Sequence, residues 1–250
     1  MKKLFLVTMA ALAVVSVSCN KKDQDNTETK IQKRLAMCGD EWDKYYFTYD
    51  ADGKIKEVKR NPSEEGNSWE RTWTFTWNGK TASVKYIKEG EEQGPLSFTL
   101  GNNGYVASFT DTWGDVRNME YTSEGYLSKV TKGTEDVKCN CVWKDGDLEK
   151  WSRFSDGVEQ FKIQTFLKDE NIGGIFPDAT DKAGIDRWMI EIGLFGKPSK
   201  HLLDQAAWEN SGSIAEHEYE KDADGFVTTV TKYYDGEVDQ VYIYEWEVIK

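Results

Sequence analysis

Residues 73–84 read Trp-Thr-Phe-Thr-Trp-Asn-Gly-Lys-Thr-Ala-Ser-Val. Aromatic residues alternate with threonine, so Trp73, Phe75 and Trp77 face one way and the threonines face the other. This is the period of a β-strand with one buried face. Asn78-Gly79 then supplies the positive φ that a tight hairpin turn requires, and the chain returns toward Val84. The stretch therefore predicts an antiparallel hairpin.

The same pattern recurs along the chain as an aromatic-rich strand, a turn of Asp, Asn and Gly, and a second apolar strand. The first five turn glycines are roughly 21 to 26 residues apart, the length of two strands and two turns. The predicted turn positions are Gly53, Gly79, Gly104, Gly125, Gly146 and Gly225. Asp50 and Asp222 begin two of these turns and are interpreted as turn formers, because the other ligands of an EF-hand calcium loop are missing.

The repeat breaks after Phe161. Residues 171–177 look like a loop, and residues 181–195 carry apolar residues at helical spacing, with Asp181 as the N-cap. We therefore predict an all-β protein. Its antiparallel meander of repeated hairpins curls into a barrel-like or strongly bent sheet, with one short helical insertion near 181–195. A single β-repeat domain is predicted over residues 35–250, with the loop and helix insertion at about 168–212.

The amino terminus predicts export. Residues 1–18 have two lysines and then an apolar run of about 14 residues, which is typical of a secretory signal peptide. The run is shorter than the roughly 20 residues of a transmembrane helix. Cys19 follows the small residue Ser18, as in a bacterial lipoprotein signal, although Ser16 stands where that signal usually has Leu, Val or Ile. We expect lipid attachment at Cys19. The alternative is an ordinary signal peptide with a chance cysteine.

The segment after Cys19 predicts a location. Residues 19–34 are mostly polar and are expected to form a flexible, lipidated tether. Their mixed lysines and acidic residues resemble the surface-export signal of Bacteroidetes lipoproteins. We expect an outer membrane lipoprotein of the cell envelope, facing the exterior, with the membrane as its partner through the lipid anchor. The formal net charge of −12 disfavours nucleic acid, whose phosphates require a basic surface.

The remaining cysteines do not suggest a metal or a cofactor. Cys139 and Cys141 are two apart in a strand-like run, so their side chains should point to the same face. Outside the cytoplasm, a disulfide from Cys38 to one of the pair is expected; which of the two is left open. No fourth ligand accompanies these three thiols, and the two histidines, His201 and His217, lie far along the chain. We expect no cofactor.

A family resemblance adds to this interpretation. The repeats are followed by an insert ending Leu194-Phe195-Gly196-Lys197-Pro198-Ser199-Lys200 and by a final hairpin through Asp224-Gly225-Phe226-Val227-Thr228. Together they resemble a Bacteroidetes lipoprotein family of unknown function with a porin-like β fold, whose hairpin repeats are distantly similar to the Tyr-Asp repeats of Rhs proteins. The resemblance covers most of the mature chain and is most specific over residues 171–246. It implies fold and location, and it offers no catalytic residues.

The expected function is a non-enzymatic binding or scaffold module, with glycans or proteins as its ligands. Exposed aromatic rings could stack on sugars, and the candidate ligand-binding residues are Trp73, Trp77, Trp113, Trp143 and Trp151. The competing role for each of them is core packing. One alternative is a glycosidase-type hydrolase that uses paired carboxylates such as Glu64-Glu65 or Glu91-Glu92. The other is a carrier that holds an apolar ligand inside the barrel, lined by residues 241–246.

Overall fold

The computed structural model describes residues 31–62, 70–134, 136–155, 157–177 and 185–249. The predicted signal peptide, Cys19, most of the tether, Glu64-Glu65 and the predicted N-cap Asp181 lie outside these residues. Within the described part, no helix has the length and apolar character needed to cross a membrane.

The described chain consists mainly of β-strands, with one short helix, α1 (Arg187–Glu191), between the thirteenth strand and the fourteenth. The strands are β1 (Lys33–Gly39), β2 (Asp43–Tyr49), β3 (Ile55–Pro62), β4 (Arg71–Asn78), β5 (Thr81–Lys88), β6 (Glu91–Glu92), β7 (Leu96–Leu100), β8 (Val106–Thr110), β9 (Val116–Tyr121), β10 (Leu127–Lys132), β11 (Asp136–Lys144), β12 (Asp147–Ser155), β13 (Val158–Glu170), β14 (His201–Trp208), β15 (Ala215–Lys221), β16 (Val227–Tyr234) and β17 (Glu237–Val248).

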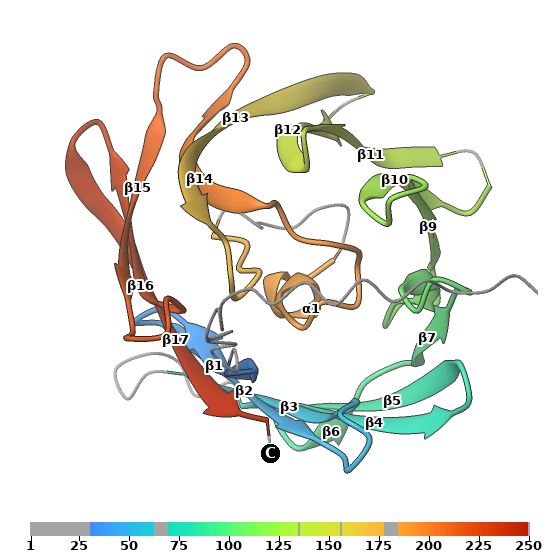
Figure 1. Cartoon of the computed structure of the whole chain (residues 1–250). Coiled ribbons are helices and arrows are strands. Elements are labelled where there is room, and N and C mark those ends of the chain that lie inside the picture. Colours follow the sequence, from blue (N-terminus) through green and yellow to red (C-terminus); the bar gives the residue numbers. More distant parts are fainter. Residues whose placement is uncertain (1–30, 63–69, 135, 156, 178–184, 250) are drawn as a thin grey trace, which may run out of the picture. The chain divides into compact units, whose positions relative to one another are not determined.

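Consecutive strands pair antiparallel, and the sheet closes on itself. β1 pairs with β2 on one side and with β17 on the other. β5 pairs directly with β7, while β6 adds a two-residue pairing to β5, so sixteen strands form the barrel. Figure 1 looks along the barrel axis and shows the strands as a ring around α1. The predicted all-β fold, a meander closed into a barrel with a short helical insertion, is confirmed.

The two faces of the barrel wall differ in polarity, as strand alternation requires. On β4 and β5, the paired residues Phe75 and Val84 are buried inside, whereas Thr76 and its partner Ser83 are exposed outside. On β15, the glutamates at positions 216, 218 and 220 are exposed, and their neighbours Ala215 and His217 are buried. The core therefore lies inside the barrel, and alternate outward positions carry polar or charged side chains.

The six predicted turn glycines all lie between consecutive antiparallel strands at one end of the barrel. Each has a positive φ, between 60° and 93°. Asp222 supports the last of these turns, since its Oδ1 accepts hydrogen bonds from the backbone N–H groups of Asp224 (2.9 Å) and Phe226 (3.0 Å). Asp50 binds its own turn in the same way through Asp52 and Lys54. These aspartates stabilise the turns as Asx-type hydrogen-bond acceptors.

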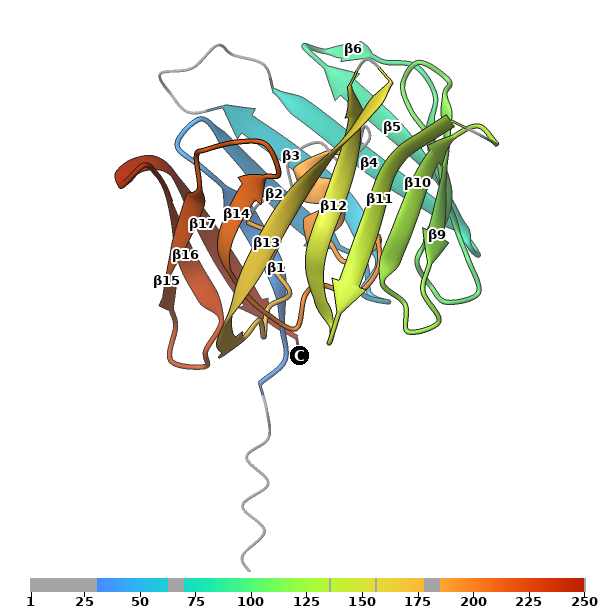
Figure 2. The same ribbon diagram turned by 90° about the horizontal axis from the view of Figure 1, so that it is seen from above.

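We call the end that carries these turns the proximal end, because β1 begins there and β17 ends there. The opposite, distal end carries the β1–β2, β8–β9, β14–β15 and β16–β17 turns. In Figure 2 the proximal end, with the carboxyl terminus, is at the bottom. The described chain therefore enters and leaves the barrel at its proximal end.

The insertion between β13 and β14 is shorter than the predicted 168–212. It spans residues 171–200. From His201 the chain is already in β14, which pairs with β13 and buries Leu202, Leu203 and Ala206. The helix is also shorter than 181–195, since its C-cap is Ile192 and Gly193 follows with φ +73°, a conformation that ends helices.

The described part of the insertion, residues 171–177 and 185–200, fills the barrel interior, and we call it the plug. The Trp188 ring lies 4.9 Å from that of Trp73 and 6.2 Å from that of Phe75. Phe195 makes edge-on contacts with Phe98 on β7 and Phe109 on β8. Residues 31–250 form one compact unit whose hydrophobic core combines plug and wall, as expected of a domain that folds by itself.

The predicted disulfide is wrong. Neither Cys38 nor Cys139 nor Cys141 takes part in a disulfide in the structure. Cys38 lies on β1 and the other two lie on β11, and these strands are not neighbours in the barrel. The Sγ atoms of Cys139 and Cys141 are 3.7 Å apart, so these two side chains do share one face.

Candidate functional site

The five tryptophans that the sequence suggested as ligand contacts differ in how deeply they are buried. Trp73 and Trp151 are core residues, 3% and 2% exposed. Trp77 and Trp143 are partly buried against the core, and their indole N–H groups donate to the carbonyls of Ile55 and Leu127. Trp113, in the β8–β9 turn of the distal end, is 86% exposed. Trp113 alone of the five therefore presents most of its ring to solvent.

The distal end also contains a cavity that the sequence did not indicate. It has a volume of about 260 Å³ and lies where β12 ends, β13 begins and β14 runs into the next turn. Trp208 and Phe161 provide its aromatic lining. The polar lining consists of Arg153, Gln160, Glu209, Asn210 and Ser211. We call it the Trp208 pocket.

Contacts within the wall position the Trp208 ring and its polar neighbours. The Arg153 guanidinium lies 4.1 Å from the centre of the Trp208 ring, and its Nε donates to Gln160 Oε1 at 3.2 Å. The Trp151 ring meets Trp208 edge-on at 5.3 Å. In the turn, the backbone N–H of Ser211 donates to the Trp208 carbonyl. The pocket thus combines an indole and a phenyl ring with a guanidinium, two amides, a carboxyl group and a hydroxyl.

Trp208 was missed because the sequence placed it inside the insertion. Residues 208–212 read Trp-Glu-Asn-Ser-Gly, an aromatic residue followed by a turn, which is the signal used for the other hairpins. Applied here, that signal predicts a strand that ends at Trp208.

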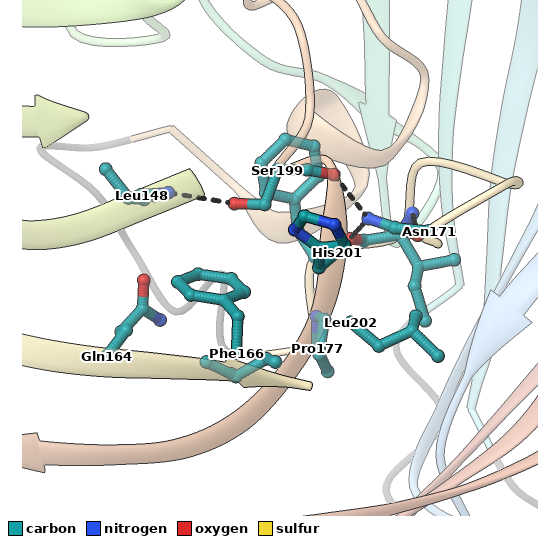
Figure 3. Close-up of a pocket in the computed structure, with 11 residues that line it drawn as sticks. Leu148, Gln164, Phe166, Asn171, Pro177, Ser199, His201 and Leu202 are labelled. Atoms are coloured by element: carbon teal, nitrogen blue, oxygen red, sulfur yellow. Dashed lines mark hydrogen bonds between the residues drawn. The ribbon is translucent and has the colours of Figure 1, made fainter. Parts of the chain in front are cut away.

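A second cavity, beside the plug, has Ser199 and His201 in its lining (Figure 3). His201 Nδ1 lies 2.8 Å from Asp147 Oδ2, and the His201 backbone N–H donates to Asp147 Oδ1. The Ser199 hydroxyl accepts a hydrogen bond from the Leu148 backbone N–H at 3.1 Å. The cavity measures about 20 Å³, room for one water molecule. These contacts hold the end of the plug on the β11–β12 turn, and the space does not admit a substrate.

A buried ion pair, Arg187 with Glu191, joins the plug to β17. Arg187 donates to the Tyr244 hydroxyl at 2.6 Å and to Glu191 Oε1 at 3.4 Å, and the Tyr244 hydroxyl donates to the same carboxyl oxygen at 3.1 Å. Burial raises the pKa of Glu191, and the neighbouring guanidinium opposes that shift. Burial likewise raises the pKa of Tyr244. The hydrogen bonds of this cluster hold α1 against the wall.

The described residues give little support to metal binding or to hydrolysis by paired carboxylates. They contain no group of three or more His, Cys, Asp or Glu side chains that could hold a metal ion. Glu91 and Glu92, the carboxylate pair that can be placed, form the short exposed strand β6.

Known structures share this fold. A porin-like protein from Bacteroides uniformis ATCC 8492 matches with a TM-score of 0.63 at 17% identity, covering 82% of this chain and 91% of that one. A porin-like protein from Bacteroides vulgatus ATCC 8482 matches with a TM-score of 0.51 at 9% identity, covering 85% and 98%. No family model matches the sequence, and no curated protein does. At these identities the likeness shows the fold alone.

Proposed function

We propose that this protein is an envelope lipoprotein whose barrel is a non-enzymatic binding module, and that it binds glycans in the Trp208 pocket. The observation that carries the proposal is the composition of the pocket. A sugar ring presents C–H groups on its face and hydroxyl groups at its edge. An indole ring suits the first, and amide, carboxyl and guanidinium groups suit the second.

The position of the pocket supports this role. It opens at the distal end, opposite the end where the chain enters the barrel. Two exposed aromatic residues, Trp42 in the β1–β2 turn and Trp113 in the β8–β9 turn, lie at the same end. A protein tethered through its amino terminus would thus present its binding end away from the anchor.

The polarity of the barrel wall supports anchoring through Cys19 rather than through the strands. A membrane-spanning barrel carries an outward apolar band about 25 Å tall. On this barrel, outward positions hold residues such as Thr76, Lys85 and Glu218, all exposed. Burying such side chains in lipid would be costly, whereas acyl chains on Cys19 would provide a stable anchor.

Binding can be tested with the fragment 31–250, which contains the whole barrel and its core. A glycan array should identify a retained glycan, and calorimetry should then measure its affinity. Asn210→Ala removes a polar group of the pocket and should weaken binding at least tenfold. Asn102→Ala, a matched change in a proximal turn, should leave the affinity unchanged. Retention of no glycan, or equal affinities for both variants, would exclude this function.

A further inference from the structure

A cavity larger than the Trp208 pocket lies at the proximal end, far from that pocket, and has no part in the function proposed above. Its volume is about 360 Å³, within the range of about 300 to 1,000 Å³ of small-molecule pockets. The barrel wall and the plug both contribute to it. Its apolar side chains are Leu35, Tyr49 and Trp246 from the wall, Ile249 just after β17, and Phe176, Ile192 and Pro198 from the plug.

The polar atoms of the two largest wall side chains are already used by the backbone. The Tyr49 hydroxyl donates to the Leu35 carbonyl at 2.8 Å, and the Trp246 indole N–H donates to the Val227 carbonyl at 2.7 Å. Both residues therefore offer ring surface to the cavity rather than a hydrogen bond. This favours an apolar or aromatic ligand.

The basic groups at the cavity also form ion pairs within the protein. Lys33 forms ion pairs with Asp222 and Asp224, each at 2.6 Å. Arg34 pairs with Glu247, and its guanidinium lies 4.3 Å from the centre of the Tyr49 ring.

The acidic group at the cavity is Glu191, whose carboxylate accepts hydrogen bonds from the Phe176 backbone N–H, the Tyr244 hydroxyl and Arg187. A ligand with a net charge would have to compete with these contacts, so the cavity selects for a neutral one.

Two glycines keep the cavity open. Gly193 on the plug and Gly53 in the β2–β3 turn both line it, and a Cβ at either position would meet no atom within 4 Å. Both have a positive φ, at which asparagine is the best tolerated residue with a side chain. Asparagine at either position would thus place atoms in the open space with little backbone strain.

We infer that the proximal cavity is a second binding site, for a neutral and mainly apolar small molecule that carries a ring. The aromatic side chains supply its contact surface, and the paired charges at its edge exclude ions. The site uses none of the residues of the Trp208 pocket.

The test uses N-phenyl-1-naphthylamine, a neutral ring compound that fluoresces strongly outside water, with the fragment 31–250. Saturable binding at one site per chain is expected. Gly193→Asn and Gly53→Asn, which add a side chain to the cavity lining from the plug and from the β2–β3 turn, should each weaken the affinity at least tenfold. Gly133→Asn is the matched control, since that glycine has φ +63° and open surroundings in the distal β10–β11 turn. It should leave the dye affinity unchanged.

The outcomes separate this inference from the proposed function. Asn210→Ala should not change dye binding, and Gly193→Asn should not change glycan binding. If one cavity variant fails to fold, the other still decides. Absence of saturable dye binding, or binding by the folded cavity variants as tight as that of Gly133→Asn, would overturn the inference whatever the glycan array shows.

Discussion

Replacing Trp188 with alanine tests whether the plug is part of the core. The side chain is fully buried and packs on the rings of Trp73 and Phe75 in the wall. Burial of about 150–250 Å² of aromatic surface, at about 25 cal/mol per Å², corresponds to roughly 4–6 kcal/mol. Measured Trp→Ala changes in cores cost about 3–5 kcal/mol. We expect the free energy of unfolding to fall by about 3–5 kcal/mol, a large share of the roughly 5–15 kcal/mol of a typical domain.

The assay is urea unfolding of the fragment 31–250 at pH 7, followed by far-ultraviolet circular dichroism. Trp113→Ala is the matched control, because it removes the same side chain from a site that is 86% exposed. Its free energy of unfolding should stay within about 0.5 kcal/mol of the wild type. Both variants should unfold in one transition with an unchanged dependence on urea concentration.

A small effect would refute the reasoning. If Trp188→Ala costs less than about 1 kcal/mol, the plug does not contribute to the core as the ring contacts indicate. A separate early transition that leaves the main one in place would show that the barrel holds together without the plug. Either result would also remove the basis for treating the proximal cavity as a preformed site, since Phe176, Ile192 and Pro198 of its apolar lining come from the plug.

Three further predictions address a turn, the buried ion pair and the anchor. Gly125→Val should lower the melting temperature more than Gly79→Val, because a Cβ at Gly125 (φ +93°) would lie 3.1 Å from the Tyr105 ring and one at Gly79 (φ +60°) meets open space; equal melting curves would contradict this. Arg187→Met should cost about 3–5 kcal/mol at pH 7, because it leaves Glu191 buried without its cation. Burial raises the pKa of Glu191 above 4.5, so the folded state favours the protonated carboxyl more than the unfolded state does. The difference in unfolding free energy between Arg187→Met and the wild type should therefore narrow as the pH falls. Urea midpoints that stay equally separated from pH 7 to pH 4 would contradict this prediction. Metabolic labelling with a fatty-acid analogue should mark the wild type and not Cys19→Ala, and equal labelling of both would rule out the anchor.

Hairpins were predictable because their signals are local. Alternation in Trp73, Phe75 and Trp77 depends only on the two-residue period of a strand, and Asn78-Gly79 marks a turn whatever surrounds it. The same pattern assigned these side chains to one face. It could not say whether that face lines a core or a binding surface, because this depends on closure of strands that are far apart in the sequence.

The plug illustrates what local patterns leave out. Apolar residues at helical spacing predicted a helix over 181–195, yet α1 spans Arg187–Glu191. Between Gly193 and Lys200 the chain instead bonds to the wall, with the Leu194 carbonyl accepting from Val106 and the Lys197 N–H donating to Gly125. These are tertiary contacts, and they replace the hydrogen bonds that a longer helix would have made. The Trp208 pocket was hidden for a related reason, since it needs three strand ends to meet.

The insertion also explains how this barrel can have an apolar interior. Eight strands already enclose an interior that side chains can fill, and barrels of sixteen or more strands leave a water-filled channel unless something occupies it. Here Trp188 and Phe195 of the plug pack on aromatic residues of neighbouring strands, Trp73 on β4 and Phe98 and Phe109 on β7 and β8, and help to bury them. The interior is filled with apolar side chains and the outward positions carry polar ones. A membrane channel has the opposite arrangement, with an apolar outer surface and a polar interior. The likeness to porin-like proteins therefore extends to the path of the chain, and the reversed polarity is the reason for proposing an anchor on Cys19 rather than in the strands.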